Sequence, residues 1–500
     1  MNLFMPMDLT KKSPIKCILL FTLPILLSYL LQQVYTIADA AICGQFLNAN
    51  EVAGVNNTTN LVFLVLQFVL GITAGFSVIT SNLFGQNNMN GIRISFATQI
   101  KLAFIVSIIV TVISVFLINP LLGIIGLRES TEAVQNEIYH SAYTYIFIIY
   151  MGIITQVFYN LICSFLRSVG DSTTPLLFLL LSTIINILLD LLFITIFKWG
   201  VSGAAIATVI AQGISAIGCF IYTFVKYKEY RLSKDDFKID FAYSFKHLKM
   251  GLPLALQFSI LSIGLIVMQS GIVQFDSNEL GQVIRSDAQN GFGAAIKLNN
   301  LLMCPYNALG TTMLTYCGQN LGANDFKRIK KGVNSAMLLA LIGYVIIGGL
   351  GLLLTINGSY LYLFYSSDKI TPEAIKFGNA YLYCDMCLYF ILGALIVYRN
   401  SVQGLGKSLF PFLAGIGELA ARTSICLTLP SILNGSKVTT EANIHALFGL
   451  AVADPFAWIC ACIFLLTGSW LYIYSKNAKQ RLEIYWKINI KNWLLIFIRI

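Results

Sequence analysis

The chain has 500 residues, of which 57% are hydrophobic and only 11% are charged. Soluble globular proteins devote about a quarter of their residues to charge, so this composition excludes a soluble enzyme and a disulfide-stapled secreted domain. The formal net charge of +10 comes from basic residues that lie between apolar stretches rather than on one face. This pattern argues against nucleic-acid binding and indicates a multi-pass protein in a lipid bilayer.

Twelve apolar stretches are long enough to cross a bilayer, because a transmembrane helix needs about 20 apolar residues. In chain order they are residues 15–38, 52–82, 95–118, 137–164, 174–197, 201–225, 247–274, 288–317, 334–356, 374–403, 409–432 and 445–475. We therefore predict an all-α integral membrane protein with twelve transmembrane helices. The first stretch is too long for the core of a signal peptide and is expected to remain as a helix.

The basic residues predict the orientation of the chain, because cytoplasmic connections carry an excess of Lys and Arg. Most of the 33 basic residues precede the first span, lie in the even-numbered connections or follow the last span. The opposite side has only Arg128, Lys198, Arg285, Lys369, Lys376 and Lys437. We expect both termini to be cytoplasmic, in a plasma membrane that is most simply a bacterial inner membrane.

Three short motifs recur in the same order in the two halves of the chain, which indicates a duplicated unit of six helices. They are Leu23-Pro24 with Leu252-Pro253, Gly85-Gln86-Asn87 with Gly318-Gln319-Asn320, and Gly170-x-Ser172-x-x-Pro175 with Gly406-x-Ser408-x-x-Pro411. Because six is even, the two copies have the same orientation in the membrane. The expected domains are an N-lobe (1–225), a cytoplasmic linker (226–249), a C-lobe (250–475) and a basic, aromatic cytoplasmic tail (476–500).

Ionisable residues inside spans are costly to bury and are therefore candidates for function. Asp39 shares a helical face with Tyr35 and Thr36, and Asp190 lies one turn after Asn186. Two carboxylates with amide and hydroxyl neighbours can hold a monovalent cation or a proton, and the sequence does not choose between them. In the alternative interpretation, Asp39 lies at an outer helix end and Asp190 is a structural hydrogen-bond partner.

Longer motifs throughout residues 15–475 resemble the multidrug and toxic compound extrusion (MATE) family of efflux transporters. They are Gln33-Val34-Tyr35-x-x-x-Asp39, Gly85-Gln86-Asn87, Leu166-Arg167-Ser168-Val169-Gly170-Asp171, Asn186-x-x-x-Asp190, Gly203-Ala204-Ala205-Ile206-Ala207-Thr208, Gly318-Gln319-Asn320-x-Gly322-Ala323 and Glu418-x-x-x-Arg422. The resemblance implies twelve helices in two lobes, related as parallel repeats. It also implies export of organic cations or other toxic compounds in exchange for protons or sodium, with no cofactor.

In the branch of this family that couples through its N-lobe, the resemblance places the cation-coupling site at Asp39, Asn186, Asp190 and Thr208. A sodium ion at these four residues is the only metal that it implies. The other branch uses carboxylates in the C-lobe, and there the chain departs from the pattern. Gln257 stands at one of those positions, and Asp385 lies about two turns from the other.

The remaining polar residues in spans have less specific interpretations. The candidates for the substrate cavity are Tyr35, Thr36, Gln257, Lys297 and Asp385. Lys297 either neutralises a carboxylate in the cavity or extends its ammonium group to the bilayer surface. Glu418 and Arg422 lie four residues apart on one helix, which favours a structural ion pair.

These observations predict a secondary active antiporter for small cationic or amphipathic substrates. The alternative is a lipid-linked sugar or lipid flippase of the same superfamily, which would need a cationic cavity. An enzyme is not expected, because His140, His247 and His445 are not paired at metal-ligand spacing. A membrane scaffold would leave the repeat and the buried aspartates unexplained. One chain would contain the whole cavity, so a monomer suffices.

Overall fold

The computed structural model describes residues 6–238, 240–365 and 370–487 of the chain, and these residues are mostly helical. The first half contains α1 (Pro14–Phe46), α2 (Ala49–Gly85), α3 (Met89–Phe116), α4 (Ile118–Ile124), α5 (Ala133–Met151), α6 (Ile153–Ser168), α7 (Thr173–Asp190) and α8 (Gly200–Lys226). The second half contains α9 (Phe241–Val273), α10 (Asp287–Gly322), α11 (Phe326–Leu354), α12 (Pro372–Gly404), α13 (Leu409–Asn434), α14 (Ile444–Ala451), α15 (Ala453–Ser469) and α16 (Ala478–Lys487).

These helices form the twelve predicted spans. Ten described helical segments are long and apolar enough to cross a membrane, and the pair α5 and α6, bent by 47°, makes an eleventh span. The twelfth is α10, which has 36 residues but is interrupted by polar side chains such as Lys297. The predicted fold of twelve transmembrane helices in two lobes is confirmed. Helix α1 extends to Phe46, so Asp39 lies inside a helix rather than at its end.

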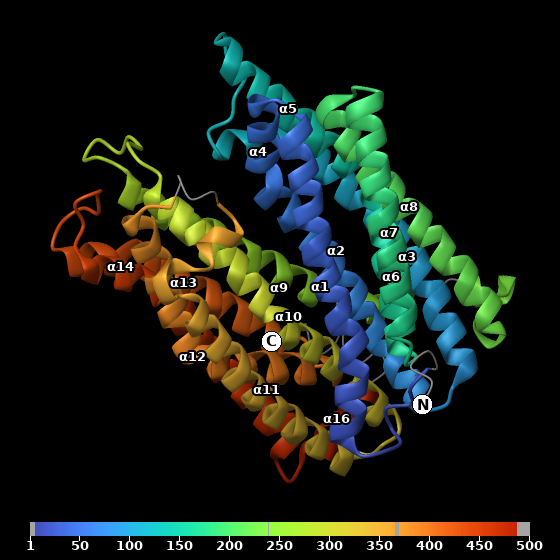
Figure 1. The fold of residues 1–500 in the computed structure, drawn as a ribbon. Helices are drawn as coiled ribbons and strands as arrows, with labels where there is room; N and C mark the ends of the chain where they lie inside the picture. The colour runs from blue at the N-terminus through green and yellow to red at the C-terminus, as the bar shows by residue number, and fades with distance from the viewer. Residues whose placement is uncertain (1–5, 239, 366–369, 488–500) are drawn as a thin grey trace.

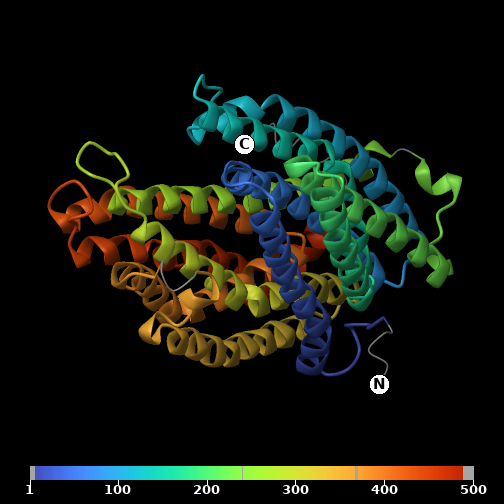
Figure 2. The ribbon, with the colours of Figure 1, turned by 45° about the horizontal axis from the view of Figure 1, so that its top comes forward.

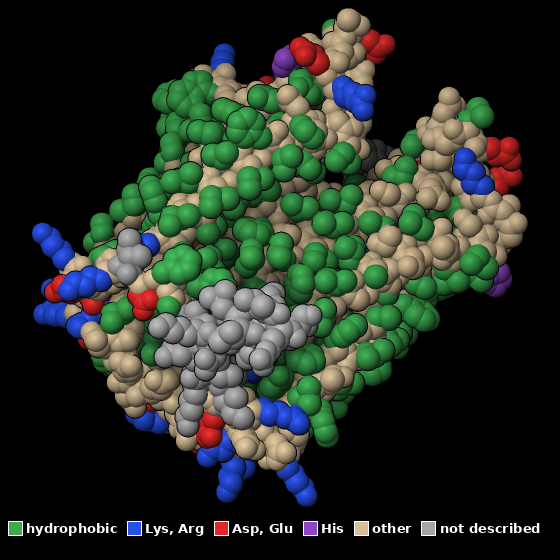
Figure 3. Space-filling model, turned by 180° about the vertical axis from the view of Figure 1, so that it is seen from behind, with side chains coloured by type: hydrophobic (Ala, Val, Ile, Leu, Met, Phe, Trp, Pro, Cys, Tyr) green, Lys and Arg blue, Asp and Glu red, His purple; other side chains and the backbone are tan. Residues whose placement is uncertain are grey.

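The two lobes meet along α2, α9 and α10 at one end of the molecule and diverge at the other (Figure 1). Glycines allow the close contact: a Cβ atom at Gly75 would lie 2.5 Å from the Cα atom of Gly251, and one at Gly71 would lie 2.7 Å from that of Ala255. Most Lys and Arg side chains gather at the closed end, whereas the opposite end is hollowed between two prongs (Figure 3). We call these the basic end, where α1 begins, and the open end.

Helix α1 contacts both lobes and lies between them (Figure 2). In the half near the basic end, Cys17, Phe21 and Ile25 are buried in the same core as α10 to α15. In the half near the open end, Cys43 is buried in a core with residues of α8. The segment predicted as part of the N-lobe therefore begins with a helix whose first turns pack against the C-lobe.

The helix ends correct the register of one predicted repeat. Asn87 and Asn324 both have a positive φ, of 56° and 57°. The residues that follow, Asn88 and Asp325, cap α3 and α11 in the same way, each accepting a backbone N–H three residues later. The structural equivalent of Gly85 is therefore Gly322, one helical turn after the Gly318 that the sequence motif suggests.

The connection between the lobes is shorter than residues 226–249. Helix α8 ends at Lys226, two short turns follow (η2, Lys228–Tyr230, and η3, Lys234–Phe237), and α9 already begins at Phe241. Beyond the last span, α16 ends at Lys487, and the rest of the predicted tail lies outside the described residues.

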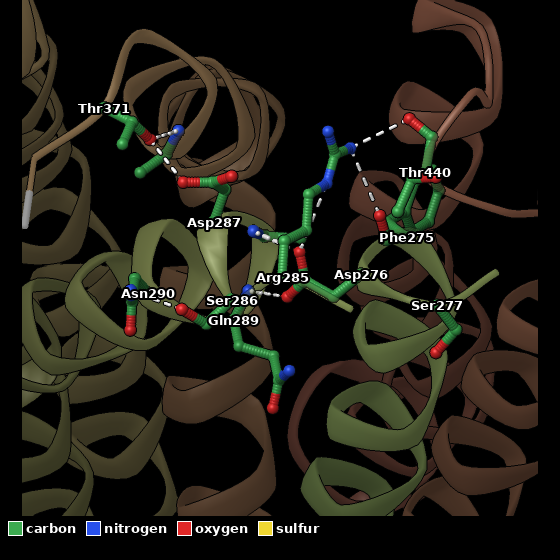
Figure 4. Close-up of polar contacts among 12 residues, drawn as sticks. Phe275, Asp276, Ser277, Arg285, Ser286, Asp287, Gln289, Asn290, Thr371 and Thr440 are labelled. Atoms are coloured by element: carbon green, nitrogen blue, oxygen red, sulfur yellow. Dashed lines mark hydrogen bonds and ion pairs between the residues drawn. The ribbon is translucent and has the colours of Figure 1, made fainter. Parts of the chain in front are cut away.

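Polar contacts brace the C-lobe at the open end (Figure 4). The buried Asp276 carboxylate accepts the N–H groups of Ala288 at 3.0 Å and Gln289 at 2.9 Å, at the start of α10. Arg285 donates to the carbonyl oxygens of Phe275 and Thr440. These contacts join the ends of α9 and α10 to the α13–α14 loop, so the outer end of the C-lobe is held together by charge-assisted hydrogen bonds.

Candidate functional site

Helix α7 places two polar side chains on a buried face at the end of a helix whose other faces are apolar. Asn186 and Asp190 are both fully buried and lie one turn apart. After Asp190 the chain continues as a π-helix, η1 (Leu191–Ile196). Such π segments in α-helices often mark functional sites. Here it begins directly at the buried carboxylate.

Helices α1, α7 and α8 bring together the four residues predicted to couple cations. Thr208 is the central hydroxyl, because its Oγ1 lies 3.3 Å from the Tyr35 hydroxyl and accepts from Asn186 Nδ2 at 3.4 Å. The carboxyl groups of Asp39 and Asp190 lie next to each other. We call these five residues the N-lobe cluster.

The N-lobe cluster contains buried oxygen atoms that form no hydrogen bond with any described residue. They are Asp39 Oδ1, Asn186 Oδ1, Asp190 Oδ1 and Asp190 Oδ2. Burying such atoms without a partner costs several kcal/mol, roughly 2–7 per group for neutral groups and more for charged ones. Oxygen atoms of this kind are ligands for hard cations, and a carboxyl pair can also hold a proton. The cluster therefore fits a small monovalent cation or a shared proton.

A larger metal centre is not indicated in the parts of the chain that the structure describes. No group of three or more His, Cys, Asp or Glu side chains is placed there to hold a metal ion. The two carboxylates of the N-lobe cluster lie with one amide and two hydroxyl groups, and oxygen atoms of this kind suit a hard cation better than a soft transition metal.

The sequence did not identify Tyr145 of α5 as part of this region. Its hydroxyl lies close enough to Asp39, Tyr35 and Asp190 to interact electrostatically with each of them. No local pattern distinguishes Tyr145 among the 24 tyrosines of the chain. Only the packing of α5 against α8 brings it to the cluster.

Three residues predicted for the substrate cavity are not part of the N-lobe cluster. Thr36 is exposed and donates to the Gln32 carbonyl of its own helix. Lys297 is also exposed, and its ammonium group lies over the rings of Phe364 and Tyr365 at 5.6 and 5.7 Å from the ring centres. Gln257 is fully buried in the C-lobe, where it accepts a hydrogen bond of 2.6 Å from Gln403.

Glu418 and Arg422 lie 3.2 Å apart and belong to a larger buried network in the C-lobe. Arg399 of α12 binds the second oxygen of Glu418 at 2.5 Å, and Arg422 binds Asp454 of α15 at 2.5 Å. The sequence could not identify Arg399 and Asp454 as partners, because they come from other helices. Arg399 is buried inside α12, so it does not belong to the basic residues of a connection between spans.

Asp385 is joined to this network through neutral side chains. Its Oδ2 accepts from Asn299 at 3.0 Å, Asn299 also donates to the Tyr381 hydroxyl, and Tyr381 donates to Asp454 at 2.8 Å. Asp385 is fully buried, and its Oδ1 forms no hydrogen bond within the described residues. Asp385 therefore lies inside the C-lobe, on other helices than the N-lobe cluster.

Comparisons with known proteins agree with this architecture. The MatE family model matches residues 24–192 and 255–427. The probable multidrug resistance protein YpnP of Bacillus subtilis is 28% identical over 402 residues, which are 80% of this chain and 85% of YpnP. The probable multidrug resistance protein YoeA of the same organism is 24% identical over 483 residues, 95% of this chain and 97% of YoeA.

Among solved structures, the outward-facing conformation of a multidrug resistance MATE family transporter of the MOP superfamily has the same fold. Its TM-score is 0.76 at 20% identity, and the match covers 96% of this chain and 98% of that one. The first segment matched by the family model includes Asp39, Asn186 and Asp190, whereas Thr208 lies between the two matched segments.

Proposed function

This chain belongs to the MatE family and is a multidrug efflux transporter rather than an enzyme, and on that premise we propose that it is a secondary active antiporter. It exports organic cations or other toxic amphipathic compounds in exchange for protons or sodium. In this proposal the basic end lies in the cytoplasm, which the distribution of Lys and Arg supports, and the open end faces outward, in the orientation of a bacterial inner membrane.

The observation that carries this proposal is the set of unpartnered buried oxygens in the N-lobe cluster. Two adjacent carboxylates cannot both stay ionised and buried without a compensating charge. A proton or a sodium ion supplies that charge. Asp39, Asn186, Asp190 and Thr208 are the residues that would hold it.

The coupled ion can drive export only if it binds one conformation more tightly than the other. The cluster is built from α1, α7 and α8, and α1 also packs against the C-lobe. Charge neutralisation at Asp39 therefore acts on a helix that contacts both lobes. Binding of the ion from the open side would change the position of α1 and hence the relative stability of the two conformations.

The charge distribution supports a cationic substrate over the flippase alternative. A pyrophosphate-bearing lipid would need cationic groups in the cavity. Arg422 is occupied by Glu418 and Asp454, and Lys297 lies over aromatic rings. Tyr35 and Tyr145 instead lie near the carboxylates of Asp39 and Asp190, and a combination of aromatic rings and carboxylates suits flat organic cations.

Uptake of a fluorescent lipophilic cation into proteoliposomes, under separately imposed proton and sodium gradients, tests this proposal. Gradient-driven flux should be lost in Asp39→Asn and in Asp190→Asn. Asp287→Asn is the matched control, because it removes an aspartate charge at the open end of α10, where Asp287 accepts from Thr371. Normal gradient-driven flux in both cluster variants would refute the assignment.

A further inference from the structure

The residues that precede α1 connect the two lobes at the basic end. We call residues 7–11 the strap. The Met7 N–H group donates to the Gly170 carbonyl at 2.8 Å, on the α6–α7 turn of the N-lobe. The Leu9 N–H group donates to Gln319 Oε1 at 3.1 Å, on α10 of the C-lobe. The strap is therefore hydrogen-bonded to both lobes at once.

Gln319 makes a second contact between the lobes. Its Nε2 donates to the Ser168 carbonyl of the N-lobe at 2.9 Å, and the side chain is fully buried. One end of the amide thus accepts from the strap while the other end donates to α6. Both bonds are to backbone atoms, so they depend on the position of the lobes and not on the rotamer of a partner side chain. This geometry exists only while the lobes are together.

The strap is held more firmly by the C-lobe than by the N-lobe. The Leu9 carbonyl accepts from Arg328 at 2.9 Å and from Asn320 at 3.3 Å. The Leu9 side chain is fully buried in the core of the C-lobe helices. When the lobes separate, the strap is expected to stay with the C-lobe. The bonds that must break are then Met7 to Gly170 and Gln319 to Ser168.

The N-lobe side of this contact is rigid. Gly170 has φ of +93°, and a Cβ atom there would lie 2.4 Å from the Met7 carbonyl oxygen. Next to it, the buried Asp171 accepts from Thr174 and Tyr227 and pairs with Lys226 at 3.1 Å. Burial alone would raise the pKa of Asp171, but these hydrogen bonds and the lysine charge hold it below its ordinary value. A fixed carbonyl pair is thus presented to the strap and to Gln319.

The lobes also touch directly beside the strap. A Cβ atom at Gly85 would lie 1.9 Å from the Gln319 carbonyl oxygen, and one at Gly322 would lie 1.9 Å from that of Asn82. The helices α2 and α10 are therefore in backbone contact at the positions where Gln319 bridges to α6. Such contact leaves no space for a side chain between α2 and α10 at this level.

We propose that Gln319 is a positioning residue for transport, which together with the strap forms a clasp that stabilises the conformation closed at the basic end. The clasp must open once in every cycle for substrate to enter from the basic side. This inference rests on the proposed function only because export needs alternating access. The strap is followed closely by α1, so the strap and Asp39 lie on one continuous segment of the chain.

Distances between spin labels test the clasp without a transport assay. Labels are introduced as spin-labelled non-canonical amino acids at Glu229 and Lys476, because the chain has eleven native cysteines. Both positions are exposed at the basic end. Glu229 is tied to the N-lobe through Tyr230, whose ring packs against Phe165 at 5.6 Å. Distance distributions are measured in nanodiscs for the native chain and for each variant.

Gln319→Met should shift the populations towards longer distances, by about fivefold in the ratio of closed to open states, because one net hydrogen bond is lost between the lobes. Gln319→Glu keeps the acceptor for Leu9 but cannot donate to Ser168, and it should shift the populations in the same direction. Gln403→Met, which removes an amide within the C-lobe, should leave them unchanged. Deletion of residues 2–9 gives the same expected shift without altering any buried side chain of α10.

Unchanged distances in Gln319→Glu and in the deletion would overturn the clasp, even if Gln319→Met does not fold. An equal shift in Gln403→Met would also overturn it, since the effect would then be a general loosening of the C-lobe. A shift in a chain that shows no gradient-driven flux would keep the clasp and refute the proposed antiport. Normal gradient-driven flux with no change in the distances of the variants would keep the proposed antiport and refute the clasp.

Discussion

The substitution Arg422→Met tests how much the buried charges of the C-lobe contribute to stability. The guanidinium group contacts Glu418 and Asp454, and all three side chains are about 5% exposed. Methionine has a similar length but no charge, so Asp454 would be left buried with the Tyr381 hydroxyl as its one partner among the residues that the structure describes. Removing one partner of a buried ion pair costs about 3–5 kcal/mol.

The assay is thermal unfolding of the purified protein in detergent, followed by size-exclusion chromatography of the fraction that stays folded. At about 2–4 °C per kcal/mol for a lobe of this size, the lower figure of 3 kcal/mol predicts a fall in Tm of about 6–12 °C. Arg231→Met is the control, because that arginine is exposed and, among the described residues, donates only to the Phe224 carbonyl. It should change Tm by no more than about 1 °C.

A double variant isolates the cause of this loss. Arg422→Met with Asp454→Asn removes the uncompensated charge, so part of the lost stability should return. Tm values that are equal for Arg422→Met and the native chain would refute the reasoning. The reasoning would also be refuted if the decrease in Tm of the double variant equalled the sum of the decreases of the two single variants, because the two charges would then act independently.

Three further predictions concern the basic end and the N-lobe cluster. Asp171→Asn should lower Tm at neutral pH, because a carboxyl with a lowered pKa stabilises the fold only while it is ionised. The difference in Tm between the variant and the native chain should shrink as the pH falls below 3.8, the ordinary pKa of the carboxyl group. Equal differences in Tm at pH 7 and at acidic pH would contradict this. Gly85→Ala should lengthen the distances between the labelled lobes, since its Cβ would clash with the Gln319 carbonyl, and unchanged distances would show that the contact can relax. Tyr145→Phe should change the cation concentration for half-maximal flux by about twofold to fivefold through loss of one hydroxyl near Asp39, whereas unchanged flux at every concentration would remove Tyr145 from the site.

The sequence predicted those features that depend on local periodicity. Twelve apolar stretches predicted twelve spans, and spacings of four residues placed Asn186 with Asp190 and Glu418 with Arg422 on common faces. The family resemblance added Thr208, which lies on a different helix from its partners. Composition alone would not have separated it from the other threonines.

Features that depend on contacts between distant segments could not be predicted. Asp454 and Arg399 are 32 and 19 residues from their partners Arg422 and Glu418, with no periodic relation to them. The predicted alignment of Gly85 with Gly318 was wrong by one helical turn. The Gly-Gln-Asn motif begins at the last residue of α2 in the first half, but one turn before the last residue of α10 in the second half. The strap has no sequence pattern, since its contacts are made mainly by backbone groups.

Binding of the coupling cation by the N-lobe cluster can be observed directly in an infrared difference spectrum of the purified protein, recorded between high and low pH and with and without sodium. We expect a carboxyl C=O band that appears on protonation or changes on sodium binding. This band should be absent from Asp39→Asn and Asp190→Asn and retained in Asp287→Asn. Difference spectra that are identical in the native chain and in both cluster variants would contradict the claim that the N-lobe cluster binds the coupling cation.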